Sequence, residues 1–319
     1  MATTQQLMSI QDLRSIENLE LLAKQVVEGF ILGLHKSPFH GFSVEFAEHR
    51  IYNPGEATRH IDWKVYGRTD KLFTKKYEEE TNLRCQIVID ASSSMYFPEA
   101  EKNEQGLHIN KLIFSAICAS SIMHLLKLQR DAAGLTIFAD DILLHTKAAS
   151  NIVHQKLLQS QLENFIGRSS RDLKTEAAKC LHVIAENVHR RSLVIVFSDM
   201  FEGNENTEEL FSALQHLKHN KHEVILFHVV DKKHEIDFTY DNRPYVFVDM
   251  ESGEKVKVRS NEVKSHYMEQ MVKFMKNLKT RCDQYKIDFI EADMNKEFSQ
   301  VLMPYLVKRM KMKEWNSII

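Results

Sequence analysis

Four stretches of the chain are almost continuously apolar, and segments with other patterns separate them. They are RCQIVID (84–90), SLVIVFSD (192–199), HEVILFHVVD (222–231) and KIDFIEAD (286–293). A strand lacks polar alternation when both faces of its sheet are covered, as in parallel sheets packed between helices. The pattern therefore predicts an α/β fold with a mostly parallel sheet and helices on both faces.

The segments between these strands predict helices and two further pairs of strands. Helical periodicity covers residues 108–129, 151–165, 175–191, about 260–285 and about 295–311. AAGLTIFADDILLHT (132–146) predicts two strands that meet at an Asp-Asp turn. RPYVFVDMESGEKVKVRS (243–260) predicts a hairpin around Ser252-Gly253, within an insertion near residues 231–259.

The first 84 residues have a different character. Between Met8 and Leu34 apolar residues recur with a helical period. Residues 35–84 combine turn formers, aromatic residues and charges of both signs, which favours short strands such as FSVEF and KLFTKKY. We therefore predict an N-terminal helix and strand-rich region over residues 1–84 and the α/β domain over residues 85–319.

Composition and charge exclude several classes of protein. The chain has 319 residues, with 42 basic against 44 acidic side chains and a formal charge of −2, so a dedicated nucleic-acid binder is not expected. The four cysteines are scattered without metal or redox spacing, which indicates free, mostly buried thiols. We find no signal-peptide pattern and no apolar run near the ~20 residues of a membrane span. A cytoplasmic protein is the resulting expectation.

Polar side chains follow two of the predicted strands directly. Asp90 ends one strand and Asp199 ends the next apolar run, so both carboxylates should emerge at the same edge of the sheet. Ser92 and Ser94 follow the first aspartate at alternate positions, and Thr175 opens a helix after the loop IGRSSRDLKT. This oxygen-only set suits Mg²⁺ or Mn²⁺ rather than Zn²⁺. The alternative is that these side chains only cap loops and helices.

The pattern Asp-x-Ser-x-Ser after a core strand, a distant threonine and a later aspartate resembles the metal-ion-dependent adhesion site (MIDAS) of von Willebrand factor A (vWA) domains. That resemblance implies a Rossmann-like vWA fold. It also implies direct metal contacts from Ser92, Ser94 and Thr175, with Asp90 and Asp199 acting largely through water. One departure is local: Leu173-Lys174 precede the threonine, where family members usually carry glycine.

A second resemblance covers nearly the whole chain. The segment from GFSVEFAEHRIYNPGEATRHIDW to QIVIDASSSM is similar to the bacterial domain-of-unknown-function family numbered fifty-eight. The matching positions in its N-terminal part are Glu45, Arg50, Tyr52, Gly55, Arg59, Asp62 and Trp63, whereas Glu56-Ala57 replace the usual pair of aspartates. The resemblance implies a role beside a MoxR-type AAA+ ATPase that remodels or matures other proteins.

The N-terminal positions have two interpretations. They form either a recognition surface or a network of ion pairs that holds a small, turn-rich module together. We favour the structural network, with Tyr52 and Trp63 in the core of that module. The residues concerned are Glu45, Arg50, Tyr52, Arg59, Asp62, Trp63 and Arg68.

The sequence favours binding over catalysis. It contains neither GxxxxGK[ST] nor a GxSxG nucleophile turn, and no histidine is placed by sequence to activate a serine. We therefore expect a non-enzymatic module in which Mg²⁺ or Mn²⁺ is completed by an Asp or Glu of a client protein. The alternatives are a metal-dependent phosphohydrolase and a scaffold whose metal site is vestigial.

Overall fold

A computed structural model of the chain describes most of the predicted α/β domain and short parts of the N-terminal region. The described residues are 19–27 except 22 and 25, 49–51, 63–75, 83–98, 109–166, 176–201, 207–250, 253–298 and 300–303. By its contacts the chain divides into two compact units, Met1–Gly33 with Leu83–Ile319 and Leu34–Asn82. Each unit is described by itself. The predicted division at residue 84 stays a prediction.

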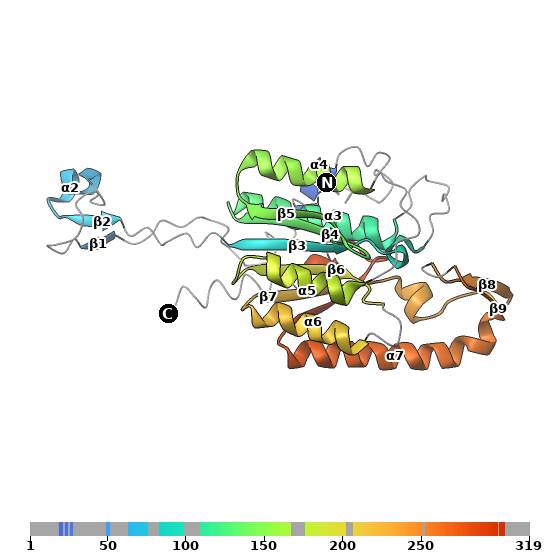
Figure 1. Ribbon diagram of the computed structural model, residues 1–319. Coiled ribbons are helices and arrows are strands. Elements are labelled where there is room, and N and C mark those ends of the chain that lie inside the picture. Colours follow the sequence, from blue (N-terminus) through green and yellow to red (C-terminus); the bar gives the residue numbers. More distant parts are fainter. Residues whose placement is uncertain are drawn as a thin grey trace, which may run out of the picture. The chain divides into compact units, whose positions relative to one another are not determined.

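The larger unit is built on a six-stranded sheet with the strand order β10-β7-β6-β3-β4-β5 (Figure 1). Its strands are β3 (Arg84–Asp90), β4 (Ala132–Phe138), β5 (Ile142–Ala149), β6 (Leu193–Ser198), β7 (Glu223–Val230) and β10 (Asp288–Asp293). Neighbouring strands are parallel except β4 and β5, which pair antiparallel across the predicted Asp-Asp turn. The predicted mostly parallel α/β sheet is therefore confirmed.

Helices cover both faces of this sheet. Figure 1 shows α3 (Lys111–Leu128) and α4 (Ile152–Ile166) on one face, and α5 (Ala177–Asn187), α6 (Thr207–His219) and α7 (Ser260–Gln284) on the other. Each face has its own apolar core. Burial on both faces explains why β3, β4 and β6 are apolar at nearly every position.

Helix α3 is apolar around most of its circumference because it is packed inside the protein. Among the described residues it is the one helix long and apolar enough to cross a membrane by length and composition, and 78% of its most apolar window is buried. A helix that is hydrophobic on all sides is expected in the core of a large α/β domain.

Several smaller predictions are confirmed as well. Strands β8 (Pro244–Val248) and β9 (Lys255–Arg259) form the predicted antiparallel hairpin, in which Gly253 has a positive φ of 72°. All four cysteines are free and buried. The predicted last helix begins later than expected: residues 295–297 are not helical, residues 298, 300 and 301–303 are helical, and residues 299 and 304–311 lie outside the described residues.

The smaller unit contains three short elements that the structure describes. Strands β1 (His49–Ile51) and β2 (Phe73–Lys75) pair antiparallel, and α2 (Trp63–Thr69) lies between them in the sequence. Strand β2 lies within the predicted strand KLFTKKY, and the predicted strand FSVEF lies outside the described residues. The helix α2 was not predicted, because the turn formers and mixed charges of this region favoured strands.

The strand order creates a switch point beside β3. The chain leaves β3 towards α3 on one face and continues to β4, whereas β6, on the other side of β3, leads to α6 on the opposite face. In an open α/β sheet the carboxyl ends of two such strands frame a crevice. Asp90 is the last residue of β3 and Asp199 directly follows β6, so the topology places both predicted carboxylates at this crevice.

Candidate functional site

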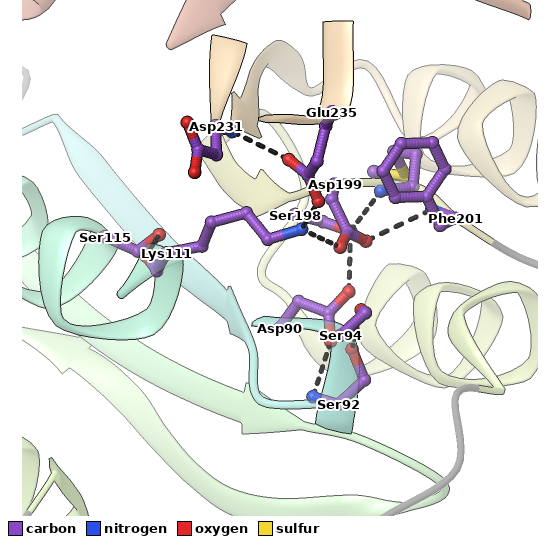
Figure 2. A network of polar contacts seen from close by, with 11 residues as sticks. Asp90, Ser92, Ser94, Lys111, Ser115, Ser198, Asp199, Phe201, Asp231 and Glu235 are labelled. Atoms are coloured by element: carbon purple, nitrogen blue, oxygen red, sulfur yellow. Dashed lines mark hydrogen bonds and ion pairs between the residues drawn. The ribbon is translucent and has the colours of Figure 1, made fainter. Parts of the chain in front are cut away.

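Asp90 is the last residue of β3 and is fully buried. Its carboxylate accepts the backbone N–H of Ser92 at 2.9 Å and the hydroxyl of Ser198 at 2.6 Å. Figure 2 shows these contacts, and both donors are uncharged groups. Burial, followed by the negative charge of Asp199, raises the pKa of Asp90 to about 7. A cation beside this carboxylate would relieve the electrostatic cost of its ionised form.

Two serine hydroxyls lie beside this carboxylate. Ser92 and Ser94 come from the turn that leads from β3 into the short 3-10 helix η4 (Ser93–Tyr96), and their Oγ atoms are 3.1 Å apart. Ser92 is fully buried, whereas Ser94 is partly exposed. The turn therefore brings Asp90, Ser92 and Ser94 together as predicted, with one hydroxyl on the accessible side.

Asp199 follows β6 and is also fully buried, but it has a charged partner. Its Oδ2 atom lies 2.7 Å from the Nζ atom of Lys111, and its Oδ1 atom accepts the backbone N–H of Phe201 at 3.1 Å. Lys111 is the first residue of α3, and its side chain has no exposed surface. An internal ammonium thus neutralises part of the charge at this edge of the sheet.

Lys111 also binds a second carboxylate. Its Nζ atom lies 2.6 Å from Oε1 of Glu235, a residue of the π-helical turn η5 (Lys232–Ile236) that follows β7 (Figure 2). Burial alone would lower the pKa of Lys111, but the carboxylates of Asp199 and Glu235 raise it overall. The ammonium is therefore a permanent charge, and it is shared between two acidic groups.

Two further aspartates end strands at the same edge. Asp231 follows β7, and its carboxylate binds Nδ1 of His234 at 2.6 Å and Nδ2 of Asn295 at 2.7 Å. Asp293 ends β10 and accepts the backbone N–H of Asn295 at 3.0 Å. Neither aspartate was predicted as a site residue, although VVD and EAD have the same form as VID and FSD. The rule that selected Asp90 and Asp199 would also have found them.

The donor set fits a hard divalent cation in its chemistry. Asp90, Ser92 and Ser94 present oxygen atoms only, and oxygen ligands are those that Mg²⁺ and Mn²⁺ prefer. Within the described ranges, no group of three or more His, Cys, Asp and Glu side chains is arranged to hold a metal. A cation at this position would therefore depend on the serine hydroxyls. Thr175, the other predicted ligand, lies outside the described residues.

The predicted N-terminal network is described only in part. Arg68 is exposed near the end of α2. For Arg50 and Trp63 the structure describes the backbone, in β1 and α2 respectively. The positions Glu45, Tyr52, Arg59 and Asp62 lie outside the described residues. The choice between a recognition surface and a structural network stays a prediction.

Taken together, the fold and the site define an α/β protein with an acidic, serine-containing crevice at a switch point of its sheet. The chain belongs to the family described as "Protein of unknown function DUF58", whose pattern it matches over residues 48–276. This result confirms the resemblance to the domain-of-unknown-function family stated for the sequence.

Comparisons with individual proteins give more distant likenesses. The chain is 24% identical over 239 residues to "Uncharacterized protein Rv1480" of Mycobacterium tuberculosis and, to the same degree, to "Uncharacterized protein Mb1516" of Mycobacterium bovis. In both cases the match covers 75% of this chain and 71% of the relative.

Two solved structures are also similar. The conserved hypothetical protein BatB from Bacteroides thetaiotaomicron has a TM-score of 0.40 at 16% identity, over 72% of this chain and 99% of that one. An aerotolerance-related membrane protein from Bacteroides fragilis has the same TM-score and identity, over 69% of this chain and 97% of that one.

Proposed function

We propose that this protein is a non-enzymatic, cytoplasmic interaction module of the vWA type, in which a divalent cation recognises an acidic side chain of another protein. Mg²⁺ or Mn²⁺ would be held by Asp90, Ser92 and Ser94, with Thr175 as a further ligand and Asp199 acting through water. A Glu or Asp of a client protein completes the coordination of the ion. The positive charge of the cation would link the carboxylates of this protein to the carboxylate of the client.

The observation that carries this proposal is the environment of Asp90. Within the described residues its carboxylate is hydrogen-bonded to neutral donors only, although it is fully buried beside a second carboxylate. Ionised carboxylates are costly to bury without a compensating charge. A cation bound at Ser92 and Ser94 supplies that charge and explains why this side of the crevice lacks one of its own.

The serine hydroxyls support binding rather than nucleophilic catalysis. Ser92 and Ser94 hydrogen-bond each other, and among the described residues neither hydroxyl is hydrogen-bonded to a histidine. A serine nucleophile needs a base within hydrogen-bond reach. We therefore propose that the module acts by adhesion. A MoxR-type AAA+ ATPase would supply the mechanical work for remodelling or maturing the client, and this part rests on the family resemblance.

One contact favours a second candidate function. Lys111 already places an ammonium on Asp199, so the crevice holds an internal cation whether or not a metal binds. On this alternative the protein is a scaffold in which the lysine has taken over the role of the ion and the metal site is vestigial.

Isothermal titration calorimetry of the full chain with MgCl₂ and MnCl₂ separates the two candidates. The metal-dependent module predicts saturable binding that Asp90→Asn abolishes. The matched control is Asp131→Asn, which alters a buried aspartate that accepts the N–H of Leu83 at the opposite end of the sheet and should leave metal binding unchanged. Absence of binding to wild-type protein would refute the metal-dependent function and support the scaffold.

A further inference from the structure

An aromatic cavity adjoins the metal crevice and is not used by the proposed coordination. Its volume is about 420 Å³, and Ser94 contributes to its wall. That volume is in the range of small-ligand sites. The aromatic side chains that line it are Phe97, Phe201, Phe238, Tyr240, Phe247 and Tyr267.

Contacts between these rings fix the shape of the cavity. The ring of Phe238 packs against Tyr267 with centroids 4.7 Å apart and against Tyr240 at 4.9 Å. Tyr240 in turn meets Phe247 edge to face at 5.3 Å. Because the rings hold one another, the cavity is largely formed before a ligand arrives, which lowers the entropic cost of binding.

The charges around the cavity are mainly negative. Glu235 and Asp249 both line it. Burial, followed by the charges of Asp231 and Glu235, raises the pKa of the Tyr240 hydroxyl to about 12. The buried Lys111 is held by two carboxylates, those of Asp199 and Glu235. Aromatic faces combined with an excess of carboxylates attract organic cations rather than anions.

Two cations in this part of the molecule already lie against aromatic rings, and one of these rings lines the cavity. The ammonium of Lys111 lies 5.4 Å from the centroid of the Phe201 ring, and the guanidinium of Arg243 lies 5.0 Å from that of Tyr245. Phe201 belongs to the cavity lining, so one of the aromatic rings of the cavity already makes this type of contact.

We infer that this cavity binds an arginine or lysine side chain of the partner segment whose acidic residue reaches the metal. Ser94 belongs to both places, so a chain that puts a carboxylate at the cation brings a neighbouring side chain to the aromatic walls. The basic side chain would lay its aliphatic stem on the rings and direct its charge towards Asp249. This inference rests on the proposed interaction function and adds the chemistry of the second contact.

The test uses capped heptapeptides with a central glutamate, in which each flanking position carries arginine, lysine, citrulline, norleucine or glutamate. Binding to the full chain is measured by fluorescence anisotropy in Mg²⁺. For at least one flanking position we expect arginine or lysine to bind about tenfold more tightly than norleucine or citrulline, and glutamate most weakly.

Two variants connect this preference to the cavity. Asp249→Asn removes an exposed carboxylate of the wall, and Tyr240→Leu removes an aromatic face but keeps an apolar side chain. In each variant the preference for a basic residue should fall to less than threefold. The control Asp283→Asn, at an exposed position near the end of α7, should retain the full preference.

The outcomes distinguish the cavity from the metal. If a chelator removes the contribution of the glutamate but the basic preference persists, both contacts are supported. If glutamate makes no contribution while the basic preference remains, the metal-dependent function fails and the cavity stands. Equal or tighter binding of norleucine at every position would overturn the inference. So would the absence of binding by every peptide at 1 mM.

Discussion

Asp90 and Asp199 end adjacent parallel strands at the same edge of the sheet, and both are fully buried, yet their surroundings differ. Asp199 has the ammonium of Lys111 at 2.7 Å. Among the described residues Asp90 has neutral donors, namely the Ser198 hydroxyl and the backbone N–H and hydroxyl of Ser92. One side of the crevice therefore carries its own cation, whereas on the other side the described partners of the carboxylate are neutral.

The difference follows from where α3 begins. Asn110 caps this helix by accepting the backbone N–H of Ile113, and the next residue, Lys111, extends from the first turn towards β6 and β7. Its side chain reaches Asp199 and Glu235 but leaves Asp90 with neutral donors (Figure 2). The difference assigns the two carboxylates separate surroundings: Asp199 anchors an internal ion pair, and Asp90 is the carboxylate at which we propose that an exchangeable ion binds.

Lys111→Met should produce the largest change in the free energy of unfolding, because it removes the buried ammonium that pairs with Asp199 and Glu235. It leaves two buried carboxylates, on Asp199 and Glu235, without their ammonium. We expect the free energy of unfolding in the presence of EDTA to fall by about 3–5 kcal/mol. Urea denaturation followed by circular dichroism measures this change.

The control for that variant lies on the same helix. Lys127 pairs with Glu20 at 2.9 Å, but both side chains are partly exposed. Lys127→Met should therefore cost less than about 1 kcal/mol. Equal losses for the two variants would contradict the view that Lys111 compensates buried charge.

The pH dependence of stability tests the surroundings of His228, which lies on the same side of the crevice as Asp199. The imidazole is buried on β7 between the rings of Phe201 and Phe289, and burial lowers its pKa to about 4. The unfolded chain protonates this histidine near pH 6.5, so it binds more protons than the folded protein below that pH. The contribution of His228 to stability is therefore fully present above pH 6.5 and is lost as the pH falls towards 4.

At pH 5 this loss should amount to about 2 kcal/mol relative to pH 8. His228→Phe should remove that part of the pH dependence, as measured by urea denaturation at both pH values. His219→Phe, at an exposed position at the end of α6, is the matched control and should keep the wild-type dependence. An unchanged pH profile in His228→Phe would show that the imidazole is not held neutral by burial.

Sequence patterns predicted the fold well because each pattern has a local physical cause. Continuous apolar strands report burial on two faces, and the Asp-Asp and Ser-Gly turns report hairpin connections. The same patterns located Asp90, Ser92, Ser94 and Asp199, since the ends of parallel strands share one edge. These predictions required only the order of strands and helices.

The lysine could not be found in this way. Lys111 opens an apolar helix, where a charged residue ordinarily lies at the solvent-exposed end, and its partner Glu235 is 124 positions further along the chain. The contact depends on how the first turn of α3 lies beside the segments that follow β6 and β7. It also depends on a π-helical turn that has no distinctive sequence. The aromatic cavity was missed for the same reason, because its rings come from five separate segments.

Replacing each aspartate in turn by asparagine should give the smallest changes in the free energy of unfolding. These variants are also the most direct test of the difference between Asp90 and Asp199. Asp90→Asn should stabilise the metal-free protein by about 1 kcal/mol at pH 8, because it removes a buried charge that repels Asp199. The amide oxygen can still accept the backbone N–H of Ser92, and the amide nitrogen can donate to the Ser198 hydroxyl oxygen, which donates to the carboxylate in the wild-type protein. Asp199→Asn should destabilise it by about 1–2 kcal/mol, because Lys111 loses one of its two charged partners. Urea denaturation in EDTA measures both changes. Shifts of the same sign would mean that the two carboxylates are equivalent, and the separate roles assigned to the two sides of the crevice would then be wrong.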